Sequence, residues 1–138
     1  MRMRIFVTAA AFLLATSAMP AWAQDSAATC KNPVTQMDLN RCSAQDYDAA
    51  DGELNLQYRE TRAALAEWDA ALPEAQRGAE KALLAGQRAW IAYRDAQCET
   101  SGFQARGGSM EPMLVSGCAA DLTRRRTGEL KDLATAME

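Results

Sequence analysis

Apolar and polar positions along most of the chain repeat at intervals of three and four residues, the spacing of an α-helix packed on one side. The pattern is clearest from about Gln36 to Asp69, where Thr35 and Asp38 resemble a capping box that would begin the helix. The seam expected there consists of Ala44, Tyr47, Asp51, Leu54, Tyr58, Thr61, Leu65 and Trp68. The pattern therefore predicts one long first helix.

A second helix is expected from about Pro73 to Thr100. Proline suits a first helical turn, because its missing N–H would have no hydrogen-bond partner there. The residues expected on the packed seam or beside it are Leu83, Leu84, Gln87, Trp90, Ile91, Arg94 and Cys98.

The stretch SGFQARGGS then interrupts the helical pattern. Gly102 is expected to end the second helix, Gly107 and Gly108 to form a turn, and Ser109 to cap a third helix. The apolar side of that helix includes Leu114, Cys118, Leu122, Leu130 and Leu133. Three helices with short connections predict an all-α, up-down-up three-helix bundle.

The hairpin between the first two helices suggests which residues face each other. A turn near Leu72 places residue i roughly opposite residue 144 − i, so Asp51 falls opposite Arg94, and the small Gly86 would make room for Tyr58. We predict an ion pair between Asp51 and Arg94 inside the bundle; the alternative is that both belong to a binding site. The residues expected in the core are Tyr47, Leu54, Tyr58, Leu84, Trp90, Ile91 and Leu122.

Residues 1–23 have the parts of a secretory signal peptide: a basic start, an apolar run over 5–18, and the cleavage pattern Ala21-Trp22-Ala23. The apolar run is shorter than the roughly 20 residues of a membrane span. An irregular segment, 24–34, would lead into a helical domain over 35–138. A retained anchor helix and a lipoprotein attached at Cys30 are the alternatives, although the residues before Cys30 fit a lipoprotein signal poorly. We expect a periplasmic or secreted protein with no membrane anchor after cleavage.

Charge narrows the classes of partner. The net charge is −3, and loss of two arginines with the signal peptide would make it −5. This balance argues against nucleic-acid binding, which needs excess positive charge. It is compatible with a basic protein partner, although its simpler role is to keep the protein soluble.

Four cysteines, Cys30, Cys42, Cys98 and Cys118, predict two disulfides in a small exported domain. The bundle would gather all four at one end, so geometry does not by itself select a pairing. We favour Cys30–Cys42 and Cys98–Cys118, because each closes a short local loop. A zinc site is the alternative, but the chain has no C-x-x-C pair and no histidine.

The sequence shows no catalytic pattern. Histidine, the usual general base, is absent, and there is no G-x-S-x-G elbow and no phosphate-binding or dinucleotide-binding glycine motif. We therefore expect no catalytic residues, no cofactor and no enzyme activity.

Four segments together are similar to one family: TQMDLNRCSAQDYDAADGELNLQY, LLAGQRAWIAYRDAQC, GGSMEPM and CAADLTRRRTGEL. From about Cys30 to Leu133 the chain resembles the lysozyme inhibitor LprI-like N-terminal domain. The matching positions are Cys42, Tyr47, Ala50, Asp51, Leu54, Asn55, Tyr58, Gln87, Arg88, Trp90, Tyr93, Arg94, Cys98, Gly108, Ser109, Cys118, Leu122 and Arg126. The resemblance implies an exported, helical, disulfide-bonded domain, and the family's name implies inhibition of lysozyme.

The leading hypothesis is thus an exported inhibitor that occludes the cleft of a lysozyme. The loop from Arg106 to Ser109 would reach the cleft carboxylates, and Arg88 and Tyr93 are the other candidate contacts with a protein partner. The alternatives are an envelope interaction module with no lysozyme role and, less favoured, a carrier of a small ligand. No oligomeric state is predicted.

Overall fold

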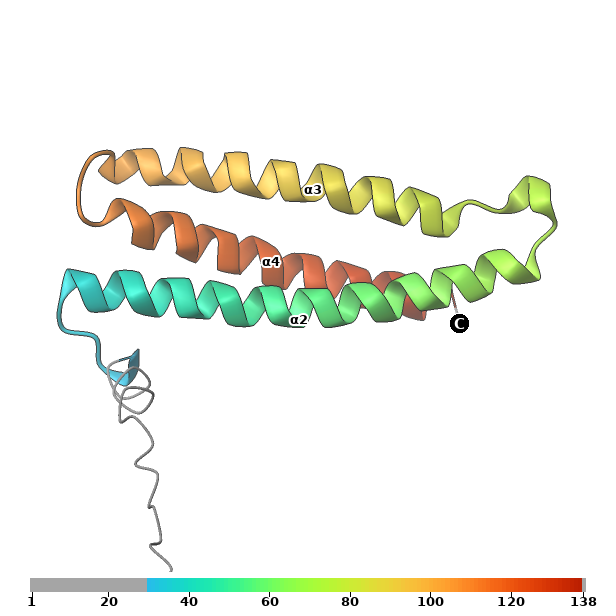
Figure 1. Ribbon diagram of the computed structural model, residues 1–138, viewed down its shortest axis with the longest axis horizontal. Coiled ribbons are helices and arrows are strands. Elements are labelled where there is room, and N and C mark those ends of the chain that lie inside the picture. Colours follow the sequence, from blue (N-terminus) through green and yellow to red (C-terminus); the bar gives the residue numbers. More distant parts are fainter. Residues whose placement is uncertain (1–29, 138) are drawn as a thin grey trace, which may run out of the picture.

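The structure, a computed structural model, describes residues 30–137 (Figure 1). Within that range it contains three α-helices, α2 (Gln36–Ala71), α3 (Ala79–Gly102) and α4 (Glu111–Thr135), joined by the 3-10 turns η1 (Glu74–Gln76) and η2 (Phe103–Ala105). The helices run up, down and up, which confirms the predicted all-α bundle. The expected signal peptide, 1–23, and most of the segment 24–34 lie outside the described residues.

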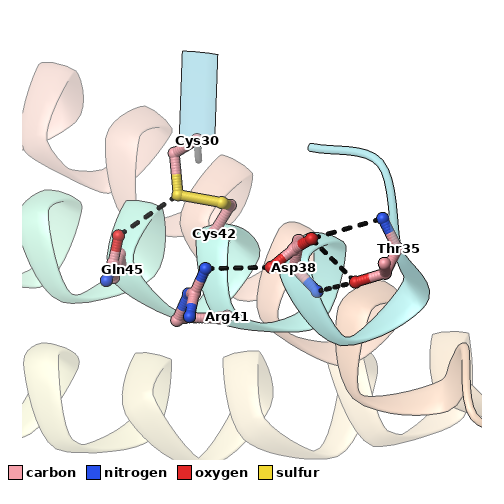
Figure 2. The surroundings of a disulfide bond; sticks show 6 residues. All are labelled: Cys30, Thr35, Asp38, Arg41, Cys42 and Gln45. Carbon is pink, nitrogen blue, oxygen red and sulfur yellow. Dashed lines mark hydrogen bonds and ion pairs between the residues drawn. A yellow bond between two sulfur atoms is a disulfide. The ribbon is translucent and has the colours of Figure 1, made fainter. Parts of the chain in front are cut away.

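Helix α2 begins with the predicted capping box at Thr35 (Figure 2). The backbone N–H of Asp38 donates to the Thr35 hydroxyl at 3.1 Å, and the backbone N–H of Thr35 donates to the Asp38 carboxylate at 3.3 Å. The Thr35 hydroxyl also donates to this carboxylate and lowers the pKa of Asp38. These bonds satisfy groups that the first turn of a helix otherwise leaves without partners.

Helix α3 begins later than predicted, at Ala79 instead of Pro73. Gly78 has a positive φ of 139°, which interrupts the helix between η1 and α3. The carboxylate of Asp69, at the end of α2, accepts backbone N–H groups of Gly78, Ala79 and Glu80 at 3.0–3.1 Å. Asp69 therefore caps α3 from the preceding helix, a role that the sequence analysis did not assign.

The turn between α3 and α4 agrees in part with the prediction made from the sequence. Helix α3 ends at Gly102 as predicted, and a Cβ atom there would lie 2.6 Å from Cγ2 of Val115, so the two helices meet closely. Ser109 does not cap α4, because the cap residue is Met110, which makes no side-chain hydrogen bond there. The carbonyl of Ser109 instead accepts a hydrogen bond from Asn40 of α2 at 2.9 Å.

The core lies around α4, which packs against both other helices, most extensively against α2. Helices α2 and α3 contact each other least. The buried cluster consists of Leu54, Leu65, Leu83 and Leu130, with Tyr58 and Trp90 packed against it. Among the residues described, no helix combines the length and hydrophobicity that crossing a membrane requires.

This arrangement corrects the predicted face of α3. Because α3 packs mainly on α4, its buried seam contains Leu83, Gln87, Arg94 and Cys98. Ile91, expected in the core, is 39% exposed, so that prediction was wrong. Of the other expected core residues, Leu54 is buried, and the half-buried ones are Tyr47, Tyr58, Leu84, Trp90 and Leu122.

Two further expectations for the contact between α2 and α3 are wrong. Gly86 is exposed, and a Cβ atom there would meet nothing within 4 Å, so it makes no room for Tyr58. At the far ends of the predicted α2 seam, Ala44 and Trp68 are exposed. The two helices diverge, whereas the prediction assumed a closely packed hairpin.

Candidate functional site

Helix α2 begins, α3 ends and α4 begins at the same end of the bundle (Figure 1). Two disulfides lie toward this end, and Figure 2 shows the first of them, Cys30–Cys42. Cys30 is bonded to Cys42, and Cys98 to Cys118, which are the pairs that the sequence favours. The first ties the segment before α2 to that helix, and the second joins the end of α3 to α4. Together they fix the end of the bundle covalently.

Hydrogen bonds hold the α3–α4 connection and the first turn of α4 against α2. The side-chain amide of Asn40 donates to the carbonyl of Ser109 at 2.9 Å. The hydroxyl of Ser43 donates to the carbonyl of Met113 at 3.0 Å. The connection is therefore anchored by α2 on one side and by the Cys98–Cys118 disulfide on the other.

Arg106 is the charged group that this connection presents to solvent. Its Nη1 donates to Glu111 Oε1 at 2.9 Å, and its guanidinium lies 4.4 Å from the centre of the Phe103 ring. The backbone N–H of Gly107, which has a positive φ of 76°, donates to the other oxygen of Glu111 at 2.8 Å. The Gly107 N–H, followed by Arg106, lowers the pKa of Glu111. The Arg106 side chain is thus oriented while 56% exposed.

Exposed apolar side chains come from the same end of the bundle. They are Val34 and Met37 beside the start of α2, and Phe103 and Met110 beside the α3–α4 connection. We call Val34, Met37, Phe103, Arg106 and Met110 the disulfide-end surface. Apolar and aromatic side chains with an arginine are the composition typical of protein-binding sites.

The Asp51–Arg94 ion pair lies further along the bundle, between α2 and α3. Arg94 Nη1 is 3.3 Å from Asp51 Oδ1, and Arg94 Nε is 2.9 Å from Asp95 Oδ1. The rings of Tyr47 and Trp90 each lie 5.2 Å from the guanidinium carbon. Arg94 is buried, but the Asp51 side chain is 38% exposed, so the predicted pair exists with only its arginine inside the bundle. Burial also raises the pKa of Tyr47.

The diverging helices leave a groove of about 310 Å³ between α2 and α3. Its residues are Asp51, Leu54, Asn55, Tyr58, Leu84, Gln87, Arg88, Ile91 and Arg94. Tyr93 lines a second groove, between α3 and α4, together with Asp121 and Arg125.

The four predicted partner contacts therefore do not form one site. Arg106 and Ser109 are exposed at the disulfide end, whereas Arg88 and Tyr93 are exposed midway along α3 and line different grooves. The exposed apolar residues of the disulfide-end surface, Val34, Met37, Phe103 and Met110, were not predicted from the sequence. Phe103 carried a signal, because it is an isolated aromatic residue in an otherwise polar connection.

Comparisons with known proteins give the same family as the sequence pattern. Residues 21–130 match the protein family described as "Lysozyme inhibitor LprI". The chain is also 55% identical, over 139 aligned residues, to an uncharacterized protein of Rhizobium meliloti (strain 1021), and the match covers 99% of each protein. No solved structure matches the chain.

Proposed function

Because the chain belongs to the lysozyme inhibitor LprI family, we propose that it is an exported inhibitor whose disulfide-end surface binds a lysozyme and blocks its substrate cleft. The single observation that carries the choice of surface is the arrangement of Arg106. This arginine is held by Glu111 and Phe103 in a connection fixed by the Cys98–Cys118 disulfide, with exposed apolar side chains at the same end.

The chemistry of the surface suits a glycosidase cleft. Such clefts carry a pair of catalytic carboxylates, and an arginine presents several donors in a geometry that matches a carboxylate. Only Nη1 and the stacked face of Arg106 are engaged within the described residues, so further N–H groups remain to donate to a partner. Phe103 and Met110 would exclude water around this contact, which strengthens a central charged interaction.

Rigidity supports the same surface. Binding costs free energy whenever a flexible loop must be ordered, and a surface ordered in advance avoids that cost. Here the Cys98–Cys118 disulfide, the Asn40–Ser109 hydrogen bond and the Glu111 bonds order the connection before any partner arrives. Inhibition would follow from occupation of the cleft and would require no catalytic group or cofactor in the inhibitor.

The charge of the protein would assist association. With a net charge of −5 after signal cleavage, the protein would be attracted to a basic lysozyme before the surfaces meet. The association rate should fall as salt concentration rises, since salt screens this long-range attraction.

An exported location is part of the proposal. Both disulfides are of the kind that persists in oxidising compartments, and residues 1–23 have the pattern of a signal peptide. We place the protein in the periplasm or outside the cell, with cleavage after Ala23. An N-terminal sequence beginning at Gln24 on the exported protein would support this location.

A lysis assay with the purified protein, residues 24–138, tests the function. We expect inhibition of at least one lysozyme of the c, g or i type at micromolar concentration. Arg106→Ala should weaken it at least about tenfold, because a central arginine is removed from the interface. Arg59→Ala, at an exposed position within α2, is the matched control and should leave inhibition unchanged.

Two results would count against the proposal. One is no inhibition of any of the three lysozyme types, and the other is equal inhibition by the Arg106→Ala variant, which would reject the assigned surface. Recovery of an unrelated envelope protein, with no muramidase, on immobilised protein would favour the alternative of an interaction module without a lysozyme role.

A further inference from the structure

A stripe of side chains on α3 lies beside the seam that packs on α4, on the side of the groove between α2 and α3. Its members recur at steps of three and four residues, which places them on one side of the helix: Lys81, Leu84, Arg88, Ile91, Asp95 and Glu99. We call them the α3 stripe. All are exposed except Leu84, which is half-buried. The stripe has basic residues in its first half, acidic residues in its second half and Ile91 between them.

The charged side chains of the α3 stripe make few ion pairs within their own chain. Lys81, Arg88 and Glu99 form no ion pair among residues 30–137. Asp95 binds Arg94 through Oδ1, and its side chain is still 62% exposed. Ile91 is an apolar side chain 39% open to solvent at the edge of the α2–α3 groove.

From this charge order we propose that the α3 stripe binds the same stripe of a second copy of the protein, with the two helices antiparallel. A two-fold axis between Ile91 and Ala92 places residue i opposite residue 183 − i of the second copy. Arg88 then faces the partner's Asp95, and the symmetry repeats this opposite-charge contact.

The apolar positions fit the same register. Ile91 faces the partner's Ala92, so a large side chain meets a small one. Leu84 faces the methylene groups of the partner's Glu99, whose carboxylate Lys81 can reach from one turn away. Ala92, exposed beside Ile91, is small and permits a close approach of the two helices. The second α3 would cover the opening of the α2–α3 groove.

A parallel arrangement in register would instead place Arg88 against the partner's Arg88 and Asp95 against the partner's Asp95. Like charges in contact across an interface disfavour association. The order of charges thus selects the antiparallel dimer. Arg88, a candidate contact with lysozyme on sequence grounds, is assigned to this second interface.

Sedimentation equilibrium of residues 24–138, from about 1 to 100 µM, tests the proposal. We expect a concentration-dependent species of twice the monomer mass. Arg88→Asp should weaken it at least about tenfold, because an aspartate then faces the partner's Asp95. The double variant Arg88→Asp with Asp95→Arg should restore the dimer, since the opposite charges are exchanged. Asp132→Arg, at an exposed position of α4, is the control and should dimerise as the wild type does.

Three outcomes would overturn the proposal. They are a wild-type protein that stays monomeric over the whole range, a dimer that Arg88→Asp does not weaken, and a double variant that remains monomeric while its melting temperature shows that it is folded. The same variants keep this result separate from the inhibitor function. Arg88→Asp should inhibit lysozyme as well as the wild type, and Arg106→Ala should dimerise normally.

Discussion

At the scale of single residues, Arg94 shows how a charged side chain can be part of a small core. It is buried, contacts two carboxylates that reach solvent and lies near the rings of Tyr47 and Trp90. The arginine therefore contributes both packing and charge, whereas each carboxylate contributes charge alone. The two ends of the ion pair should respond differently to mutation.

We predict that Arg94→Ala lowers the free energy of unfolding by about 3 kcal/mol, because it removes a buried side chain together with its ion pairs to Asp51 and Asp95. Asp51→Asn should cost less than about 1.5 kcal/mol, since Arg94 keeps Asp95 and the lost carboxylate is partly screened by water. Urea unfolding of both variants measures the difference. If both variants lost the same free energy of unfolding, the conclusion that only the arginine of this ion pair is buried would be wrong.

Asp69 was missed by the sequence analysis for a physical reason. Its carboxylate caps residues nine to eleven positions ahead, across η1 and the break at Gly78. A capping pattern in the sequence covers about four consecutive residues. It therefore does not detect a cap that the previous helix supplies. Pro73, the local signal, suggested an earlier start.

The Asp69 cap predicts a response to acid. Backbone N–H groups, first that of Gly78, lower the pKa of Asp69 below its usual 3.8 in the folded protein. Its stabilising contribution is therefore complete above about pH 4 and is lost as the pH falls through the lowered value. Asp69→Asn should flatten the decline in melting temperature between about pH 4 and pH 2. An unchanged slope would mean that the carboxylate does not hold the start of α3.

At the scale of helices, the sequence predicted much of α2 and α4 and less of α3. The start of α2 followed from Thr35 and Asp38, which act within one turn. The buried side of α3 depended on which helix it would meet, and neighbours in sequence were assumed to be the closest neighbours in space. Because α3 packs mainly on α4, its buried side includes Leu83 in place of the predicted Ile91, which is exposed.

Gly102 gives a test of the contact between α3 and α4. An added Cβ would lie 2.6 Å from Val115 Cγ2, so Gly102→Ala should destabilise the protein by about 1–3 kcal/mol through overpacking. Gly52→Ala, in α2, is the matched control, because a Cβ there meets nothing within 4 Å. It should stabilise by about 1 kcal/mol through helix propensity. Stabilisation by both substitutions would show that α3 and α4 are further apart at Gly102 than the structure places them.

At the scale of the whole molecule, the disulfides bring together parts of a surface that the sequence could only suggest. The topology predicted that all four cysteines would share one end of the bundle, and they do. The combination of Arg106 with Phe103 and Glu111 was not predicted, because it depends on how the connection folds over the start of α4. Local pattern indicated an exposed loop, and tertiary structure gave it a defined shape.

Loss of the two disulfides should have unequal effects. The Cys98–Cys118 bond spans 20 residues and has a buried half-cystine, whereas Cys30–Cys42 spans 12 residues at the start of the bundle. Replacing Cys98 and Cys118 by serine should lower the free energy of unfolding by about 3–4 kcal/mol, as judged by thermal unfolding. Replacing Cys30 and Cys42 should lower it by about 2–3 kcal/mol. Replacing Cys98 and Cys118 should also weaken lysozyme inhibition, because it releases the connection that carries Arg106. A larger loss from the Cys30–Cys42 replacement would contradict this ranking.

The central claim, that the disulfide-end surface occupies the cleft of a lysozyme, is tested most directly by competition for that cleft. Binding of the protein to a susceptible lysozyme is measured by calorimetry while a chitin oligosaccharide, which occupies the cleft, is added in rising amounts. The account predicts that the apparent Kd of the protein rises in proportion to the oligosaccharide and that Arg106→Ala binds weakly throughout. A complex that contains lysozyme, protein and oligosaccharide together, with the Kd unchanged, would contradict it.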